Sequence, residues 1–268
     1  MRKEQSVINF CFPAISGKIS TTIDFADILI SSMQRSGSID FAGYMEDGDL
    51  RSDLLRRLGD FDAKSYTRLS PERKVKIAAT VEQTLTKCVK LLTHPELPIY
   101  IFVFPWFPGT EESKQFGGVN AVAPHSNVLH LFVNPNKHTL LSIKETVAHE
   151  YNHLIYYKMH SSKSYGLLQN MLIEGLAENF REDAVGGKPA PWATALSFAN
   201  SKKWLKEIES DLNSKSKKLS DQVLLGSTKF PKWSGYSIGY HLVKELKKRN
   251  PKMTWTELEK VSASNFLK

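Results

Sequence analysis

One stretch restricts the fold more than any other: KETVAHEYNHLIYYKMH, residues 144–160, has the pattern of a single continuous helix. Its apolar residues recur at helical spacing and form one broad face that we expect in the core: Ile143, Val147, Tyr151, Leu154 and Ile155. His149, Glu150 and His153 point away from that face. A helix that only had to be soluble would carry Lys and Glu there, so the two imidazoles need another explanation.

The spacing of these three residues suits a metal ion. His149 and His153 are four residues apart, so they lie one turn above each other and can direct two ring nitrogens at one ion. Glu150 lies beside them, close enough to act on a water at that ion. The pattern H-E-x-x-H on a helix therefore predicts a zinc site. A chance pair of surface histidines is the alternative, because the chain holds eight histidines.

A catalytic zinc site needs a third protein ligand, and Glu174 in NMLIEGLAENF is the better of two candidates. Twenty residues separate His153 from Glu174, and an antiparallel helical hairpin of that length returns the chain beside the first helix. The other candidate is His160. A metzincin series would need a glycine at position 156 and a histidine at 159, and this chain has Tyr156 and Met159 there.

Glu178 follows Glu174 by one helical turn and faces the same way. A metal-bound imidazole usually donates its other N–H to an acceptor, and Glu178 is placed to be that acceptor. An ion-pair partner on the helix surface is the alternative interpretation of Glu178.

Composition is that of a soluble globular protein: 268 residues, 41% hydrophobic and 24% charged, enough for a core without disulfides. No segment approaches 18 uninterrupted apolar residues, and the N-terminus lacks the apolar region of a signal peptide, so we expect a cytoplasmic protein with no membrane partner. Cys11 and Cys88 form no C-x-x-C pair, which argues against a thiolate metal site.

The net charge of +8 comes largely from lysines in residues 200–218 and 244–252. These lysines could form a nucleic-acid surface. Acidic residues are interleaved with them, however, which is typical of solvated helix faces. We therefore expect no nucleic-acid partner.

The order of patterns predicts an α+β fold. The first ninety-odd residues are mainly helical in pattern, with a helix that starts at Pro71 after the N-cap Ser70. Aromatic and β-branched residues then predict strands at 97–106, 117–123 and 127–135. We expect a mainly helical N-terminal region, residues 1–95, packed on a catalytic domain, residues 96–268.

After Pro135 the pattern is helical to the end of the chain. A capping box, Ser142-x-x-Glu145, predicts the start of the histidine-bearing helix. Further helices are predicted at residues 169–183, from about 192, at 236–249 and at 254–266, with an irregular loop at 213–235.

Three segments together carry a resemblance to known proteins: ETVAHEYNHLIYY, EGLAENF and GYSIGYHLVKEL. They resemble zinc metalloproteases of the gluzincin type, and more closely a bacterial family of predicted zinc proteases whose biological role is unassigned. The similarity extends over residues 95–268. It implies a zincin-like fold, in which a small sheet has an edge strand over the active-site helix, and Zn²⁺ held by His149, His153 and Glu174.

The resemblance implies two more roles. In gluzincins an edge strand before the zinc helix pairs with the substrate backbone, and here that strand would present Gly118, Val119, Asn120 and Ala121. A Tyr-x-x-Gly at the start of a later helix stabilises the oxyanion, which corresponds to Tyr236 rather than Tyr240 or His241. The alternatives are an ordinary hairpin strand and an aromatic packing residue.

These features predict a zinc-dependent peptidase that hydrolyses a peptide or protein substrate with Glu150 as general base. No exopeptidase G-A-M-E-N sequence is present, which favours an endopeptidase. Two alternatives come from other classes of protein: a catalytically silent zincin scaffold with a binding or regulatory role, and a basic nucleic-acid-binding protein.

Overall fold

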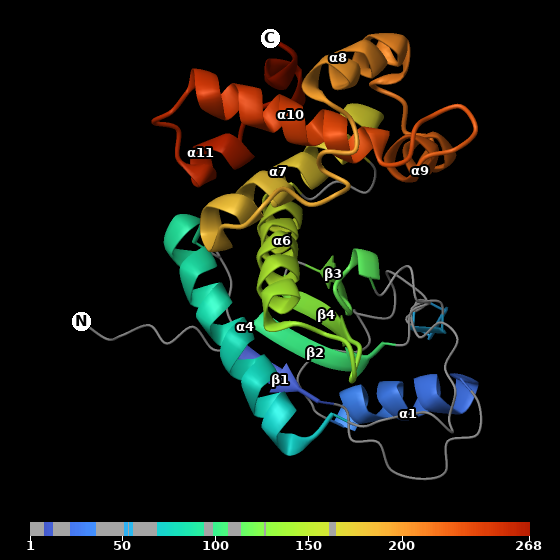
Figure 1. Ribbon diagram of the computed structural model, residues 1–268, viewed down its shortest axis with the longest axis vertical. Coiled ribbons are helices and arrows are strands. Elements are labelled where there is room, and N and C mark those ends of the chain that lie inside the picture. The colour runs from blue at the N-terminus through green and yellow to red at the C-terminus, as the bar shows by residue number, and fades with distance from the viewer. Residues whose placement is uncertain are drawn as a thin grey trace. The chain divides into compact units, whose positions relative to one another are not determined.

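The computed structural model describes residues 8–12, 22–35, 51–52, 54–55, 69–93, 99–106, 114–125, 127–160 and 165–268 (Figure 1). The chain forms two compact units. The first contains Met1–Leu85 and Pro95–Glu150, and the second contains Thr86–His94 and Tyr151–Lys268. Helix α6, Leu140–Met159, therefore contributes its first half to one unit and its second half to the other.

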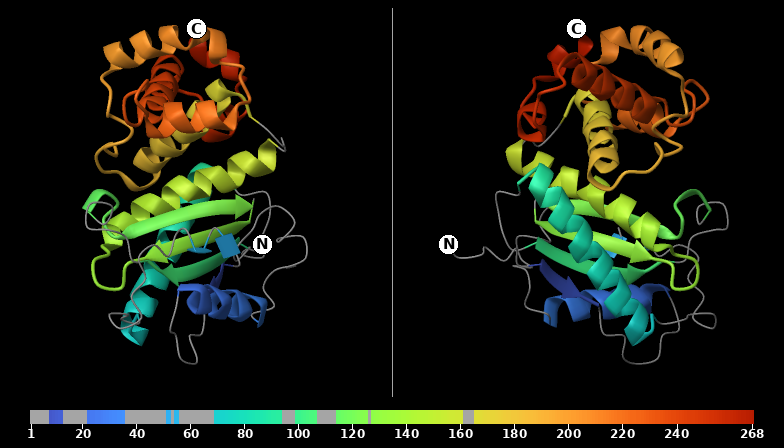
Figure 2. Two further views of the ribbon diagram at one scale, coloured as in Figure 1. Left: turned by 90° about the vertical axis from the view of Figure 1, so that its right-hand side faces the viewer. Right: turned by 60° about the vertical axis from the view of Figure 1, so that its left-hand side comes forward.

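A four-stranded mixed sheet forms the centre of the first unit (Figure 2). Its strands are β1 (Ile8–Cys11), β2 (Ile99–Pro105), β3 (Val119–His125) and β4 (Val128–Val133). Their order is β1-β2-β4-β3; the pairs β1–β2 and β2–β4 are parallel, and β3–β4 is antiparallel. The three strands predicted after residue 95 are confirmed. β1 was not predicted, since four residues carry too little periodicity to distinguish a strand.

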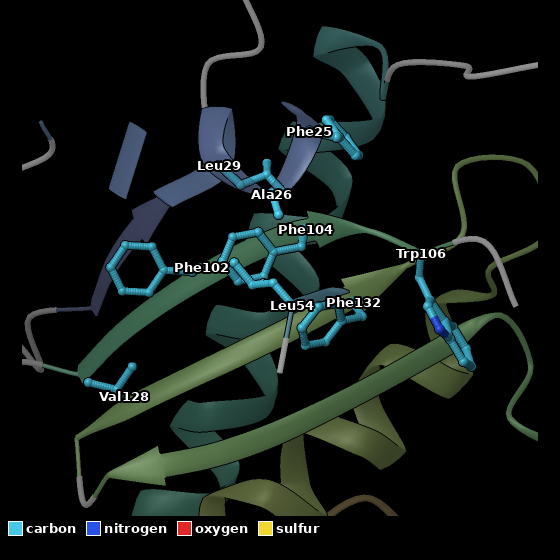
Figure 3. Close-up of a cluster of buried hydrophobic side chains, with 9 residues drawn as sticks. All are labelled: Phe25, Ala26, Leu29, Leu54, Phe102, Phe104, Trp106, Val128 and Phe132. Carbon is cyan, nitrogen blue, oxygen red and sulfur yellow. The ribbon is translucent and has the colours of Figure 1, made fainter. Parts of the chain in front are cut away.

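One face of this sheet packs against helix α1, Thr22–Arg35 (Figure 3). Side chains alternate between faces along a strand, so Phe102 and Phe104 of β2 lie on the same side as Phe132 of β4. They pack with Phe25 and Leu29 of α1, and all five side chains are fully buried.

Helices α4 and α6 of this unit lie on the opposite side of the sheet from α1 (Figure 2). α4, Pro71–Leu91, begins as predicted, with the Ser70 hydroxyl accepting a hydrogen bond from the Arg73 N–H at 3.3 Å. α6 begins earlier than the expected capping box. Its cap is Thr139, whose hydroxyl accepts from the Ser142 N–H at 3.0 Å.

The second unit is helical. Besides the second half of α6 it holds α7 (Leu167–Val185), α8 (Phe198–Glu207), α9 (Lys217–Leu225), α10 (Ser234–Arg249), α11 (Trp255–Glu259) and the 3₁₀ turns η1 (Glu209–Asp211) and η2 (Ala263–Leu267). α7 packs along α10 (Figure 1). Strands β2, β3 and β4 follow one another in the chain and the helices from α6 onward come after them, which fits the α+β class. None of the described helices is both long enough and apolar enough to cross a bilayer.

Three predictions in this unit were wrong. The single helix expected at residues 254–266 is a short helix, α11, followed by the separate 3₁₀ turn η2. The helix expected from about Trp192 starts at Phe198, because residues 191–196 form turns. The loop expected at residues 213–235 contains α9, whose cap Ser216 accepts a hydrogen bond from the Leu219 N–H at 3.3 Å.

The two units do not follow the expected division at residue 95. β1 pairs in register with β2, Ile8 opposite Ile99, so the start of the chain belongs to the same sheet as the later strands. Much of residues 1–95 lies outside the described part of the chain. The packing of a separate N-terminal region on a catalytic domain therefore stays a prediction.

Candidate metal centre

The apolar face of α6 is buried as the sequence predicted. Ile143, Val147, Tyr151 and Leu154 are fully buried, and Ile155 is 1% exposed. The Tyr151 ring stacks on Phe180 of α7, and its hydroxyl donates to the Leu92 carbonyl at 2.6 Å. Packing along this face fixes the direction of the other face, which carries the candidate ligands.

His149, Glu150 and His153 form a cluster on that other face of α6. One donor atom from each residue lies within 4.8 Å of the other two, so the helix itself brings them together. His153 is 5% exposed and Glu150 is 8% exposed. Within the described part of the chain, Oε2 of Glu150 is buried without a hydrogen-bond partner. Burying a carboxylate oxygen without a hydrogen-bond donor costs free energy. Such buried oxygens without a donor are typical of sites where the carboxylate acts on a bound ligand.

Helix α7 brings a second carboxylate to His153. Oε2 of Glu174 lies 3.7 Å from Nε2 of His153. This separation is too long for an N–H···O hydrogen bond. Two ligands of a tetrahedral Zn²⁺, each about 2.1 Å from the metal, are about 3.4 Å apart. The pair therefore has the spacing of metal ligands, and its nitrogen and carboxylate donors suit zinc.

Glu178 is buried at 2% exposure one turn along α7. Its Oε2 accepts from Arg181 at 2.9 Å, and its Oε1 accepts from the indole N–H of Trp192 at 2.7 Å. These contacts place Glu178 inside the second unit rather than on its surface. A carboxylate can accept further hydrogen bonds, so its predicted contact with a metal-bound imidazole stays a prediction.

Tyr236 lies in the first turn of α10 and is half-buried. The residue before this helix, Trp233, has φ 60° and ψ 24°, a left-handed conformation that is costly for a bulky side chain. Tyr240 is 1% exposed within the helical packing, and the His241 ring contacts the Leu196 carbonyl at 3.1 Å. The assignment of Tyr236 as oxyanion donor stays a prediction.

β3 is an edge strand of the described sheet, as the resemblance implied. Val119 and Ala121 pair with β4 opposite Val133 and Leu131. Gly118 precedes the strand with φ 74°. Asn120 is half-buried between the two buried neighbours. Their role in pairing with a substrate backbone stays a prediction.

Cys88 does not compete as a metal ligand. Burial raises the pKa of the Cys88 thiol to about 12, so it stays protonated at neutral pH. The side chain of Cys11 lies outside the described residues.

The structure reveals a buried polar pair that the sequence did not indicate. Asn152, between Glu150 and His153 in the chain, is fully buried and donates through Nδ2 to Oε1 of Glu259 at 2.5 Å. Burial raises the pKa of Glu259 to about 8, and the hydrogen bond from Asn152 opposes this shift. An asparagine on a helix between apolar residues was the available signal, but its partner is 107 positions away.

These residues suit a metal ion: His149, Glu150 and His153 cluster on α6, and a carboxylate oxygen of Glu174 lies 3.7 Å from the His153 imidazole. Comparison of the sequence with known families agrees. Residues 77–268 match the model of the family "Predicted Zn-dependent protease (DUF2268)", and the chain belongs to this family.

The chain is also similar to the uncharacterized protein YjfC of Bacillus subtilis (strain 168), with 25% identity over 167 residues. The aligned region covers 57% of this chain and 53% of the relative, so the chain matches about half of that protein. No solved structure matches the chain.

Proposed function

We propose that this chain is a zinc-dependent endopeptidase with His149, His153 and Glu174 as the metal ligands. The observation that carries the proposal is the 3.7 Å separation of His153 Nε2 and Glu174 Oε2, which suits a shared ion better than a hydrogen bond. The family to which the chain belongs supports the same chemistry.

When bound, zinc supplies a Lewis acid that polarises the scissile carbonyl and acidifies an attacking water. Glu150 takes the proton from that water and delivers it to the leaving amine. Its low exposure, 8%, keeps bulk water from competing for the proton. The helix places its carboxylate beside both histidines, within the 4.8 Å cluster.

Two further groups act on the substrate in this proposal. The Tyr236 hydroxyl donates a hydrogen bond to the oxyanion that develops on the scissile carbonyl. The edge strand β3 and the glycine before it, residues 118–121, pair with the extended backbone of the peptide. Cleavage within a chain is favoured because the sequence has no G-A-M-E-N segment of the exopeptidase type.

Metal content and turnover together test the proposal. The wild-type protein should bind one Zn²⁺ per chain by elemental analysis and hydrolyse casein or a quenched fluorescent peptide, and a chelator should abolish this hydrolysis. Glu150→Gln should keep the zinc and lose turnover, since the amide cannot accept the proton. Bound zinc without any hydrolysis by the wild type would support a silent scaffold instead, and absence of zinc would overturn the proposal.

A further inference from the structure

A cavity of about 320 Å³ lies within the second unit, among side chains from α6, α7 and α9. The lining residues that matter here are Tyr157, Ile173, Glu174, Lys215, Lys217 and Leu224. All of them belong to residues 151–268, so the cavity is formed inside one compact unit.

The cavity begins at the proposed zinc ligands. Glu174 lines it and also lies 3.7 Å from His153. Tyr157 lines it too, and its ring stacks on the His153 imidazole with centroids 5.9 Å apart and an interplanar angle of 23°. A peptide group held at these ligands therefore has this cavity beside it for a neighbouring side chain.

Hydrogen bonds hold the lysine-bearing segment against α7. The side chain of Asn170, one turn before Glu174, donates to the Ser220 hydroxyl at 2.9 Å. The Leu167 N–H donates to the carbonyl of Ser214, next to Lys215, at 2.9 Å. The backbone positions of both lysines are thus fixed relative to Glu174, although their side chains reach solvent.

Charge selects the kind of side chain that this cavity accepts. Four charged residues line it: Glu174, Lys215, Lys217 and Asp221. In the proposed site, zinc neutralises the charge of Glu174. The remaining charged groups of the cavity are then the two lysines and one carboxylate, that of Asp221. Among the described residues, neither Lys215 nor Lys217 has an ion-pair partner, and Asp221 forms no ion pair with either of them. Ile173 and Leu224 provide apolar wall for the stem of a side chain.

We propose that this cavity is a specificity pocket for an acidic side chain, glutamate or aspartate, next to the bond that is cleaved. Lys215 and Lys217 pair with its carboxylate while Ile173 and Leu224 contact its methylene groups. The proposal rests on the proposed peptidase function, and it adds the substrate class: peptides with an acidic residue beside the scissile bond.

Cleavage-site profiling tests this selectivity. Zinc-loaded wild-type protein is incubated with a mixture of tryptic and chymotryptic peptides, and the cut sites are identified by mass spectrometry. Acidic residues should be enriched at one position beside the cut, and the preference should decrease at high salt because the lysines are exposed. A flat distribution, or enrichment of basic residues at that position, would overturn the proposal.

A matched peptide pair then isolates the lysines. The best library sequence is synthesised with Glu or with the isosteric Gln at the enriched position. Wild type should prefer the Glu peptide by about two- to fivefold in kcat/KM, as expected for a partly exposed ion pair. Lys215→Ala/Lys217→Ala should lose this preference, so that its kcat/KM values for the Glu and Gln peptides become nearly equal. Lys203→Ala/Lys206→Ala, which removes the same charge from exposed positions of α8, should keep it.

A binding measurement separates this proposal from the peptidase function. The two fluorescent peptides are titrated into zinc-loaded Glu150→Gln, and anisotropy is followed. Tighter binding of the Glu peptide, lost with both lysines, supports the pocket without any turnover. Hydrolysis of both peptides at equal rates by the wild type overturns the pocket alone. Failure of the wild type to cleave either peptide or any library member overturns the peptidase function, whereas equal binding of the two peptides overturns the pocket.

Discussion

The backbones of Gly175 and Gly239 are in contact where helix α7 meets helix α10. A Cβ added at Gly175 would collide with the carbonyl carbon and oxygen of Gly239, and one added at Gly239 would collide with the Met171 carbonyl oxygen. Gly175 directly follows Glu174, and Gly239 lies one turn after Tyr236. The glycines of the EGLAENF and Tyr-x-x-Gly segments are thus required by packing, since only glycine allows the two helices to approach this closely.

Gly175→Ala and Gly239→Ala should therefore each destabilise the protein by about 2 kcal/mol or more, by overpacking. Alanine gains about 1 kcal/mol of helix propensity, which is too little to offset a collision with backbone. Urea unfolding measures the change. The double variant should cost less than the sum of the two, because one separation of the helices relieves both collisions.

Gly186→Ala is the matched control for these variants. Gly186 ends α7 with φ 76°, but a Cβ there would meet nothing within 4 Å. Its cost of about 1–3 kcal/mol should come from the backbone conformation alone, φ 76° and ψ −160°, and not from a collision. If Gly175→Ala or Gly239→Ala had the same free energy of unfolding as the wild type, the close approach of α7 and α10 would be contradicted.

Glu174→Ala and His153→Ala should lose zinc, because two remaining ligands rarely hold the ion. The measurement is the ratio of zinc to protein after dialysis. Glu207→Ala, which removes an exposed glutamate of α8, should retain the metal. The thermal midpoint gives a second readout. A chelator should lower the midpoint of the wild type and leave that of Glu174→Ala unchanged, since only bound metal stabilises the fold. A normal zinc ratio in Glu174→Ala would remove this residue from the ligand set.

Glu178→Ala should weaken both the fold and the metal site. Arg181 is 2% exposed and pairs with Glu178, so removing the carboxylate leaves a buried charge without its partner, at a cost of about 3 kcal/mol. If Glu178 also accepts from a metal-bound imidazole, zinc affinity should fall by roughly ten- to a hundredfold.

Metal titration by competition with a chromophoric chelator distinguishes the two effects of Glu178. The titration is done at a temperature where circular dichroism shows the variant to be folded. Unchanged affinity in the folded variant would leave Glu178 a purely structural residue that holds Arg181 and Trp192.

Tyr236→Phe should lower kcat by on the order of a hundredfold and leave KM and zinc content nearly unchanged, because the lost hydrogen bond forms only in the transition state. Tyr240→Phe is the comparison, since this hydroxyl instead accepts from Lys244 at 2.5 Å within the helical packing. Equal kcat values for Tyr236→Phe and the wild type would mean that Tyr236 is an aromatic packing residue and not an oxyanion donor.

Glu259→Gln should stabilise the protein increasingly as pH rises. The ordinary pKa of 4.5 is raised to about 8 in the folded state, so between these values the unfolded chain releases a proton that the folded chain keeps. Wild-type stability then falls by about 1.4 kcal/mol per pH unit through that window and levels off above pH 8. Glutamine carries no such titration.

The geometry of the Asn152–Glu259 pair explains why glutamine fits there. Oδ1 of Asn152 and Oε2 of Glu259 are both buried without a partner among the described residues. A protonated Glu259 can donate from Oε2 to Asn152 Oδ1, and a glutamine amide can make the same two hydrogen bonds. Chemical unfolding at pH 5, 7 and 9 measures the difference between the two proteins, which should widen from pH 5 to pH 9. A constant difference would mean that Glu259 is ionised in the folded state.

Local patterns were sufficient where the determining interactions are close in sequence. The helix that carries His149, Glu150 and His153 follows from the spacing of its apolar residues, and the cluster follows from the turn of the helix. The start of α4 at Pro71 follows from the serine before it. The edge strand was inferred from a family resemblance, and the described sheet places β3 at its edge.

Other features depend on partners far apart in the chain, which no local pattern reveals. α9 went undetected inside a polar segment because tertiary contacts such as Asn170 to Ser220 stabilise it.

By itself, the sequence determined which residue types helix α6 presents and on which face, because an α-helix has 3.6 residues per turn whatever surrounds it. Only the tertiary structure decided that Glu174 comes within 3.7 Å of His153, that Asn152 meets Glu259, and that two glycines let α7 and α10 touch. These contacts depend on the packing of whole helices, whose geometry is set by shape and volume over many residues at once.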